Sequence, residues 1–272
     1  MSGLDAELRV LWSAVIVYVI AGSVAICGLI FRRRMERTVL AMLLLALVLH
    51  GVAIGLRWDR LGHGPFITMF EILSSNVWSL TFVFTLAYWR IPAIRPTASV
   101  VLPLIFVMLA WLLLSSPGEG FFPPTYRTVW LYIHIAFGKV FLGAVVLAVG
   151  LSGVILLRSA GIAGRLWTMP DNPSLEELAY RFLAVGLVFD TLMLISGAIW
   201  AQDAWGRYWA WDPLESWAFL TWLILGFSIH LRVTYRPPPA IAAGMVCLVF
   251  VMAYLTFFGI PFLSKVPHQG AV

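Results

Sequence analysis

Charged residues are scarce in this chain. Asp, Glu, Lys and Arg make up 11% of its 272 residues, whereas 61% are hydrophobic. Because about a quarter of a soluble protein is charged, this composition excludes an ordinary soluble domain and predicts an integral membrane protein. A helix needs about 20 apolar residues to cross the hydrocarbon core. Runs of about that length occur at residues 10–30, 38–56, 74–90, 97–116, 130–157, 180–201, 216–235 and 240–261. The predicted fold is an all-α, polytopic transmembrane helix bundle of about eight helices.

Cysteine is scarcer still. Cys27 and Cys247 each lie inside an apolar run, where cysteine usually serves as a small hydrophobic residue, and there is no Cys-x-x-Cys motif. A disulfide framework is therefore excluded. The sequence also has no internal repeat and no low-complexity tract, so we expect a single transmembrane domain over residues 1–272. The start, MSGLDAELRV, has two acids and no small-residue cleavage site after the first apolar run, so we expect the first helix to be retained.

Basic residues gather in alternate loops between the predicted spans. By the positive-inside rule these loops face the cytoplasm, which places both termini and the loops near 57–73, 116–129 and 201–215 on the extracytoplasmic side. The residues are Arg32, Arg33, Arg34, Arg37, Arg90, Arg95, Arg158, Arg165, Arg181, Arg232 and Arg236. Because they are spread over short loops and form no stripe, the net charge of +5 indicates membrane topology and no nucleic-acid binding.

One predicted outer loop is rich in tryptophan. The stretch WGRYWAWDPLESW runs from Trp205 to Trp217, between the sixth and seventh spans. Tryptophan and tyrosine often anchor proteins at membrane interfaces, but such belts are spread around a bundle. Here one connection and its flanks hold Trp200, Trp205, Trp209, Trp211, Trp217 and Trp222. This concentration favours a binding site over an anchoring belt.

Two of the five histidines lie near this loop in the predicted topology. His134 falls one turn inside the outer end of the fifth span, and His268 follows the eighth span on the outer side. A histidine in a membrane span is costly unless it has a partner, so each is either a hydrogen-bonded structural residue or part of a site. Two imidazoles on opposite sides of a metal are a common way to hold haem iron, and a sheet of tryptophans offers a flat apolar surface to a porphyrin. The pattern therefore indicates a haem site.

The residues around the loop also resemble a known family. The stretch GAIWAQDAWGRYWAWDPLESWAFLTWLILGFSIHLR is similar to the tryptophan-rich WWD signature of haem-handling cytochrome c assembly proteins. It most closely resembles the CcsA (ResC) family of the System II cytochrome c synthase, in which the signature continues as WDPKETW where this chain has WDPLESW. The resemblance extends to WLYIH, LRWDRLGHGPFITMFE and FFGIPFL, and covers roughly residues 45–270.

This resemblance implies a role in cytochrome c biogenesis, as a subunit of a holocytochrome c synthase. Haem b would bind at the extracytoplasmic loop, with His134 and His268 as axial iron ligands, and its vinyl groups would be offered to the thiols of a CxxCH segment in apocytochrome c. Asp212 and Glu215 have a second interpretation, as caps of the seventh helix. The cofactor-binding residues implied in addition to the two histidines are His63, Trp205, Gly206, Tyr208, Trp209, Trp211, Asp212, Glu215 and His230, and no catalytic residue is assigned.

His230 indicates a second subunit. At 1.5 Å per residue it lies about 21 Å inward from the start of the seventh span, too deep to reach an outer haem. In the CcsA family the matching histidine belongs to a transmembrane haem shared with a partner, so we expect a separate CcsB-like (ResB-like) subunit. His50 is the internal alternative and is equally consistent with a structural role. The resemblance further implies apocytochrome c, a thiol-reducing partner and membrane lipid as partners, in the bacterial cytoplasmic membrane.

Depth along the spans suggests one more interaction. Lys139 and Asp190 lie at similar depths in the fifth and sixth spans, which suggests a buried ion pair between these helices.

Two other function classes remain open from the sequence. One is a haem transporter or chaperone that delivers haem without attaching it, and the other is a haem-bearing anchor for electron transfer. Covalent attachment of haem in cells distinguishes a synthase from both of these.

Overall fold

The computed structural model describes residues 3–161 and 169–263, and every regular element in those ranges is helical. The chain divides into two compact units. Unit 1 comprises Met1–Phe122 with Ala163–Pro170, and unit 2 comprises Pro123–Ile162 with Asp171–Val272. Each unit is built from four long helices around a core of its own.

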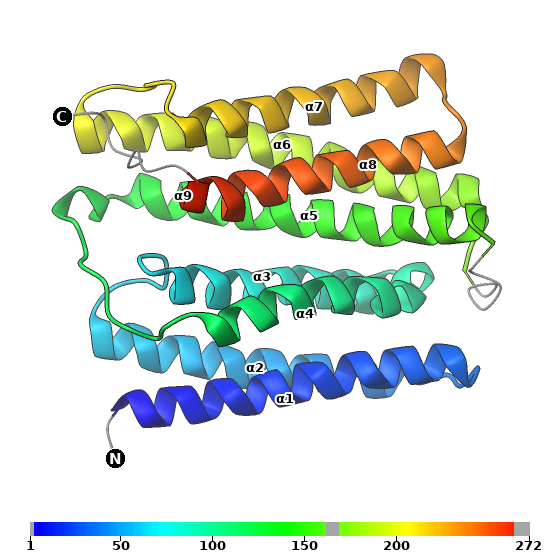
Figure 1. Ribbon diagram of the computed structural model, residues 1–272, viewed down its shortest axis with the longest axis horizontal. Helices are drawn as coiled ribbons and strands as arrows, with labels where there is room; N and C mark the ends of the chain where they lie inside the picture. The colour runs from blue at the N-terminus through cyan, green and yellow to red at the C-terminus, as the bar shows by residue number, and fades with distance from the viewer. Residues whose placement is uncertain (1–2, 162–168, 264–272) are drawn as a thin grey trace. The chain divides into compact units, whose positions relative to one another are not determined.

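Unit 1 contains α1 (Gly3–Ile30), α2 (Glu36–Leu61), α3 (Met69–Arg90) and α4 (Ala98–Leu114), with the 3-10 turn η1 (Pro92–Thr97) before α4. Each helix packs on the next, and α4 closes back onto α1 (Figure 1). The turn between α2 and α3 follows from its sequence. α2 ends where Gly62 adopts φ 73°, and α3 begins with a capping box in which the Thr68 hydroxyl accepts the backbone N–H of Glu71.

Unit 2 contains α5 (Val129–Ser159), α6 (Asn172–Trp205), α7 (Pro213–Tyr235) and α8 (Pro239–Tyr254), after the short 3-10 turn η2 (Pro124–Tyr126). α8 continues through the π-helical turn η3 (Leu255–Gly259) into α9 (Ile260–Leu263). α5 and α6 form the most extensive helix pair, α7 packs on α6 and α8, and α8 returns to α5 (Figure 1). Figure 1 shows the tryptophan-rich loop joining α6 to α7 at one end of this unit.

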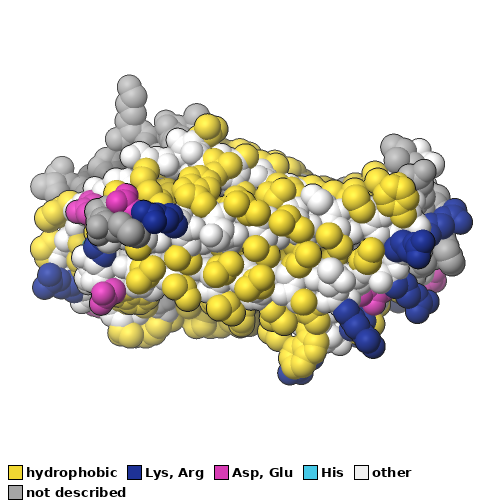
Figure 2. Space-filling view, turned by 90° about the horizontal axis from the view of Figure 1, so that it is seen from below, with side chains coloured by type: hydrophobic (Ala, Val, Ile, Leu, Met, Phe, Trp, Pro, Cys, Tyr) yellow, Lys and Arg dark blue, Asp and Glu magenta, His cyan; other side chains and the backbone are white. Residues whose placement is uncertain are grey.

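Eight helical segments of the described part are long and apolar enough to cross a membrane, which confirms the predicted fold class and number of spans. The face drawn in Figure 2 carries hydrophobic side chains over its middle and charged side chains toward its two ends. This distribution suits a chain whose middle lies in hydrocarbon and whose ends reach the headgroups. The chain is a multi-pass membrane protein. The side of the membrane on which each end lies stays a prediction.

A buried ion-pair cluster explains why α1 and α2 extend beyond the apolar runs. The Arg57 guanidinium donates to the carboxylates of Glu7 at 2.9 Å and Glu71 at 3.0 Å, and all three residues are buried. It also donates to the backbone carbonyls of Pro117 and Gly118, at 3.1 and 2.8 Å. Buried charges require such partners. The cluster thereby joins α1, α2, α3 and the segment that follows α4.

His50 is a structural residue of the unit 1 core. Its ring is fully buried, with Nε2 2.9 Å from the Ser74 hydroxyl oxygen and Nδ1 3.4 Å from the Tyr18 hydroxyl oxygen. Because both ring nitrogens face hydroxyl groups, the structural interpretation of His50 is the one that the contacts support.

The predicted ion pair between Lys139 and Asp190 is wrong. Within the described part of the chain, both carboxylate oxygens of Asp190 are buried without a hydrogen-bond partner. Equal depth does not fix the rotation of two helices about their axes. On α5, Gly138 faces Met193 of α6, since a Cβ added to Gly138 would lie 3.0 Å from the Met193 sulfur. Lys139 is the next residue and therefore points about 100° further around the helix.

Candidate functional site

The tryptophan-rich loop is fixed at both ends by helix caps. α6 ends at Trp205, where Gly206 adopts φ 77° and its N–H closes the last turn. α7 begins at Pro213 behind Asp212, whose carboxylate accepts the backbone N–H of Glu215 at 2.8 Å. The loop is therefore short and has defined ends.

Glu215 and Trp211 shape the loop between these caps. The buried Glu215 carboxylate turns back and accepts the backbone N–H of Ala210 at 2.7 Å. Trp211 has φ 58°, a left-handed conformation that bulky residues rarely adopt and that persists where the surroundings enforce it. The capping role is thus observed for Asp212, whereas the Glu215 carboxylate fixes the loop backbone at Ala210. A contact of either carboxylate with haem stays a prediction.

A pocket of about 400 Å³ lies between α6, the loop and the first turns of α7. We name it the tryptophan pocket. Its walls are Thr191, Leu194, Ile195, Ala198, Trp209, Trp211, Phe219 and Trp222. The volume is within the range of about 300–1,000 Å³ that is typical of small-molecule and cofactor sites, and the walls are almost entirely apolar, as such sites usually are. The Trp211 ring at its edge is 67% exposed, so the pocket opens outward.

Two indole N–H groups of the tryptophan pocket differ in their partners. The Trp222 Nε1–H donates to the Thr191 hydroxyl at 2.8 Å. Among the described residues, the buried Trp209 Nε1–H has no acceptor. A buried donor without an acceptor costs about 1–3 kcal/mol, so the site is better satisfied when a ligand supplies one.

His134 is held in one orientation by α6. Its Nδ1–H donates to the backbone carbonyl of Met193 at 2.9 Å, and a carbonyl can only accept. In the neutral ring the lone pair is then on Nε2, which is the form that ligates iron. The ring lies so close to Gly197 that a Cβ there would be 2.8 Å from Nδ1. Glycine at this position therefore makes the orientation of His134 possible.

Aromatic residues surround His134 on the same side of α6. The Trp200 ring lies 6.0 Å from the imidazole at an interplanar angle of 27°, and Tyr126 and Trp205 each meet Trp200 edge to face, at 5.4 and 5.0 Å. We name these four residues the histidine cluster. Burial raises the pKa of the Tyr126 phenol, so this tyrosine stays uncharged at physiological pH.

The histidine cluster and the tryptophan pocket occupy different faces of α6. His134 contacts the face of Met193 and Gly197, whereas Thr191, Ile195 and Ala198 line the pocket, more than 100° around the helix. The tryptophans therefore do not form the single flat sheet that the sequence suggested. Rings meet edge to face instead, as between Trp209 and Trp211 at 81°, because that geometry is favoured by the ring quadrupoles.

His268 is the second predicted axial ligand. His268 lies outside the described residues, and the described chain ends at Leu263, five residues before it. The π-helical turn η3 places the Phe257 ring against α5. A Cβ added to Gly138 of α5 would lie 3.3 Å from that ring. Gly138 is one helical turn from His134, so the segment that leads toward His268 packs close to the level of His134.

Two histidines lie away from the loop. His230 is exposed on α7, in line with the exposed Leu220, Leu223 and Phe227. His63 belongs to unit 1, where it is buried, its ring stacks on Phe122 at 5.2 Å and its Nδ1–H donates to the neighbouring backbone carbonyl. Tyr208, within the tryptophan-rich loop, is 60% exposed.

Sequence reasoning missed Gly197, Thr191 and Phe219. A glycine two turns before the tryptophan-rich loop, in an otherwise apolar helix, is the signal that points to a close approach at position 197.

Known proteins are similar to this chain over most of its length. The sequence profile of the family described as cytochrome C assembly protein matches residues 38–268. The chain is 31% identical over 211 residues to the cytochrome c biogenesis protein CcsA of Chlamydomonas reinhardtii, an alignment that covers 73% of this chain and 59% of that relative. It is 28% identical over 272 residues to the CcsA of Prochlorococcus marinus strain MIT 9301, with 89% of this chain and 87% of the relative covered.

A solved structure is similar in fold. The cytochrome c haem lyase CcmF superposes with a TM-score of 0.74 at 17% sequence identity, over 95% of this chain. This chain spans less than half of CcmF, 47%, so the likeness shows a shared arrangement of helices.

Proposed function

Because this chain belongs to the cytochrome c assembly protein family, we propose that it binds haem b without a covalent bond at the tryptophan-rich end of unit 2. In this proposal it presents the haem for thioether attachment to the CxxCH segment of apocytochrome c, as the CcsA-like subunit of a cytochrome c synthase. The orientation of His134 is the observation that carries the proposal. A histidine whose Nδ1–H is fixed by a backbone carbonyl has the tautomer and the rigidity of a metal ligand.

The residues present fit a haem group. Trp200 lies beside the His134 imidazole, with Trp205 and Tyr126 against Trp200, so aromatic surface suited to a porphyrin adjoins the proposed ligand. The tryptophan pocket opens on another face of α6, so it is a second apolar surface at this end of unit 2 and not the place of the iron. Residues 3–161 and 169–263 contain no group of three His, Cys, Asp or Glu that could hold a metal ion by themselves. The iron of haem already has the porphyrin nitrogens as ligands, so it needs only one or two histidines from protein.

Each of these residues has a distinct task in the proposal. His134 ligates the iron through Nε2, and Met193 and Gly197 hold its ring in place. Trp200, Trp205 and Tyr126 exclude water beside the ligated iron. When bound, haem supplies the vinyl groups to which cysteine thiols add, so the protein contributes position and orientation. His268 as the second axial ligand rests on the family resemblance.

The exposed face of α7 supports a partner subunit. His230 lies on it among exposed apolar side chains: Leu220 is 42%, Leu223 44% and Phe227 58% exposed. A histidine in a span is costly unless it faces a partner. We assign this face to a CcsB-like (ResB-like) subunit that shares a second haem through His230. A thiol-reducing partner would keep the CxxCH cysteines reduced, and the tryptophan-rich loop would lie on the extracytoplasmic face of the bacterial cytoplasmic membrane.

The test is covalent haem attachment in cells. The chain is expressed with its CcsB-like subunit and an apocytochrome that contains CxxCH, and covalent haem is measured by haem staining after denaturing electrophoresis. We expect holocytochrome with the wild type and with Trp12→Phe, a control on the exposed side of α1. We expect about a tenfold loss or more with His134→Ala.

The same experiment separates the alternative function. Wild-type protein that purifies with non-covalent haem but yields no holocytochrome alongside its partner would show delivery without attachment. Wild-type protein that purifies without haem in the presence of the partner would contradict both functions.

A further inference from the structure

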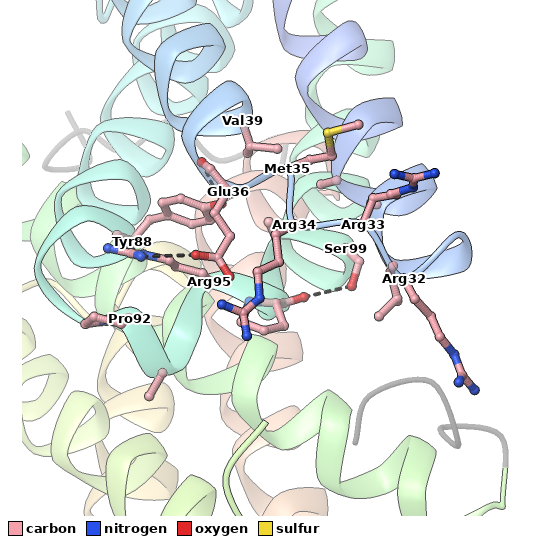
Figure 3. Close-up of a pocket in the computed structure, with 16 residues that line it drawn as sticks. Arg32, Arg33, Arg34, Met35, Glu36, Val39, Tyr88, Pro92, Arg95 and Ser99 are labelled. Carbon is pink, nitrogen blue, oxygen red and sulfur yellow. Dashed lines mark hydrogen bonds and ion pairs between the residues drawn. The ribbon is translucent and has the colours of Figure 1, made fainter. Parts of the chain in front are cut away.

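A second pocket lies in unit 1, at the end of the bundle where α1 ends and α2 begins. It has a volume of about 390 Å³ and is closed on its other side by η1 and the first turn of α4 (Figure 3). Its charged lining residues are Arg32, Arg33, Arg34, Arg95 and Glu36. Four arginines against one glutamate make the pocket strongly basic.

The wall of the pocket is built by hydrogen bonds. Arg95 pairs with the Glu36 carboxylate at 3.1 Å and donates through Nε to the Tyr88 carbonyl at 3.2 Å. The Tyr88 hydroxyl donates to the Glu36 backbone carbonyl at 3.2 Å. These contacts join the start of α2, the end of α3 and η1. The single acidic group of the pocket is thereby occupied by one of the four arginines.

The other three arginines come from a tight turn. The Arg33 N–H donates to the Gly28 carbonyl at 2.9 Å, and Arg32 has φ 53°, so the chain folds back over the end of α1. Figure 3 shows the three side chains leaving this turn in different directions, with Arg34 on the side where Arg95 lies in that view. In the described part of the chain, no acidic side chain forms an ion pair with Arg32, Arg33 or Arg34, and all three are exposed. Three cations remain for an external anion.

Apolar side chains border the same turn. Ile30 is 43%, Phe31 70% and Met35 41% exposed, and Met35 also lines the pocket. These residues stand at the ends of two helices long and apolar enough to cross a membrane, so they lie at the level where hydrocarbon meets headgroups. A basic pocket with an apolar border matches an amphiphile that carries a negative headgroup and acyl chains.

We propose that this pocket binds the phosphodiester headgroup of an anionic phospholipid, which the charges of Arg33 and Arg34 attract, with the acyl chains along α1 and α2. Arginine suits the phosphate oxygens because its guanidinium donates several hydrogen bonds in a fixed plane. The bound lipid offsets part of the positive charge of the turn and holds the ends of α1 and α3 together. A free phosphate has the same charge chemistry but makes no use of the apolar border, so the lipid is the occupant that the whole pocket fits.

The test uses the full chain purified in a neutral detergent. Phosphatidylglycerol or phosphatidylcholine is titrated in, and retained lipid is counted by native mass spectrometry, with the thermal midpoint followed in parallel. The variant Arg33→Gln/Arg34→Gln removes two charges from the pocket. The control Arg37→Gln/Arg181→Gln removes two exposed charges that do not line it. The variant Arg33→Lys/Arg34→Lys keeps the charge and guards against a folding defect.

We expect wild type and control to prefer phosphatidylglycerol over phosphatidylcholine, and the Gln variant to bind phosphatidylglycerol about 30-fold more weakly, the effect of two basic residues near a membrane surface. The Lys variant retains most of the preference. Equal binding of both lipids by the wild type would overturn the proposal, as would an equal loss in control and Gln variant. Inorganic phosphate that displaces phosphatidylglycerol or gives the same stabilisation alone would show a site for a soluble anion instead.

Discussion

Gly197→Ala is the substitution that most sharply tests how His134 is held. Because an ordinary nonbonded contact is about 3.5 Å, the imidazole has to retreat by about 0.7 Å from a methyl carbon that would lie 2.8 Å from Nδ1. Met193 lies on the same helix as Gly197. The retreat of the imidazole therefore also lengthens its 2.9 Å hydrogen bond to the Met193 carbonyl beyond hydrogen-bonding distance. Loss of such an orienting bond usually costs 10–100-fold in metal affinity, so we expect haem to bind about tenfold more weakly or worse.

The same substitution leaves the helix itself sound. Alanine is favoured over glycine in a helix interior by about 1 kcal/mol, so a lower haem affinity cannot be attributed to a weaker α6. Gly226→Ala in α7 is the matched control, because no atom lies within 4 Å of its Cβ position. Affinity is measured by titrating haem into purified protein and following the Soret band. Wild-type affinity and an unchanged spectrum in Gly197→Ala would show that the close approach at position 197 does not orient His134.

Three further predictions concern the polar groups of the two units. In haem-free protein, Trp209→Phe should leave the thermal midpoint unchanged or higher, because the described residues offer no acceptor to the Trp209 N–H. Trp222→Phe removes a 2.8 Å hydrogen bond to Thr191 and should lower the free energy of unfolding by about 1 kcal/mol. Differential scanning fluorimetry distinguishes the two variants. Arg57→Gln should destabilise unit 1 by about 3–5 kcal/mol, because it leaves the buried carboxylates of Glu7 and Glu71 unpaired. Arg181→Gln, which breaks only an exposed ion pair with Glu177, should cost less than about 1 kcal/mol by the same assay. Asp190→Asn should change unfolding by less than about 1 kcal/mol, since a broken buried ion pair would instead cost several.

The number and order of the spans could be predicted because each requires a run of apolar residues, and hydrocarbon imposes that requirement locally. The ends of the helices could not. α1 begins at Gly3 and not near residue 10 because Glu7 is neutralised by Arg57, and an apolar-run scan contains no information on a partner 50 residues away. α6 begins at Asn172 for a related reason, since its first turns carry charged residues at the edge of the membrane.

The candidate site was predicted by residue type and misjudged in its arrangement. The sequence identified His134 and the tryptophans because their types and their crowding are unusual in a span. It did not reveal that His134 contacts one face of α6 whereas Trp209 and Trp222 line a pocket on another, because that depends on the rotation of the helix. The same limitation made the Lys139 and Asp190 prediction fail, since similar depth does not bring side chains together unless both helices present them to each other.

Ligation of haem iron by His134 at the tryptophan-rich end of unit 2 can be examined with a cavity variant. His134→Gly is purified with its partner subunit, and the absorption spectrum is recorded before and after imidazole is added. We expect the haem spectrum to be lost or altered in the variant and to return toward that of the wild type with imidazole, because free imidazole occupies the position of the missing ligand. A variant with the wild-type spectrum, or a lost spectrum that imidazole does not restore, would contradict ligation by His134.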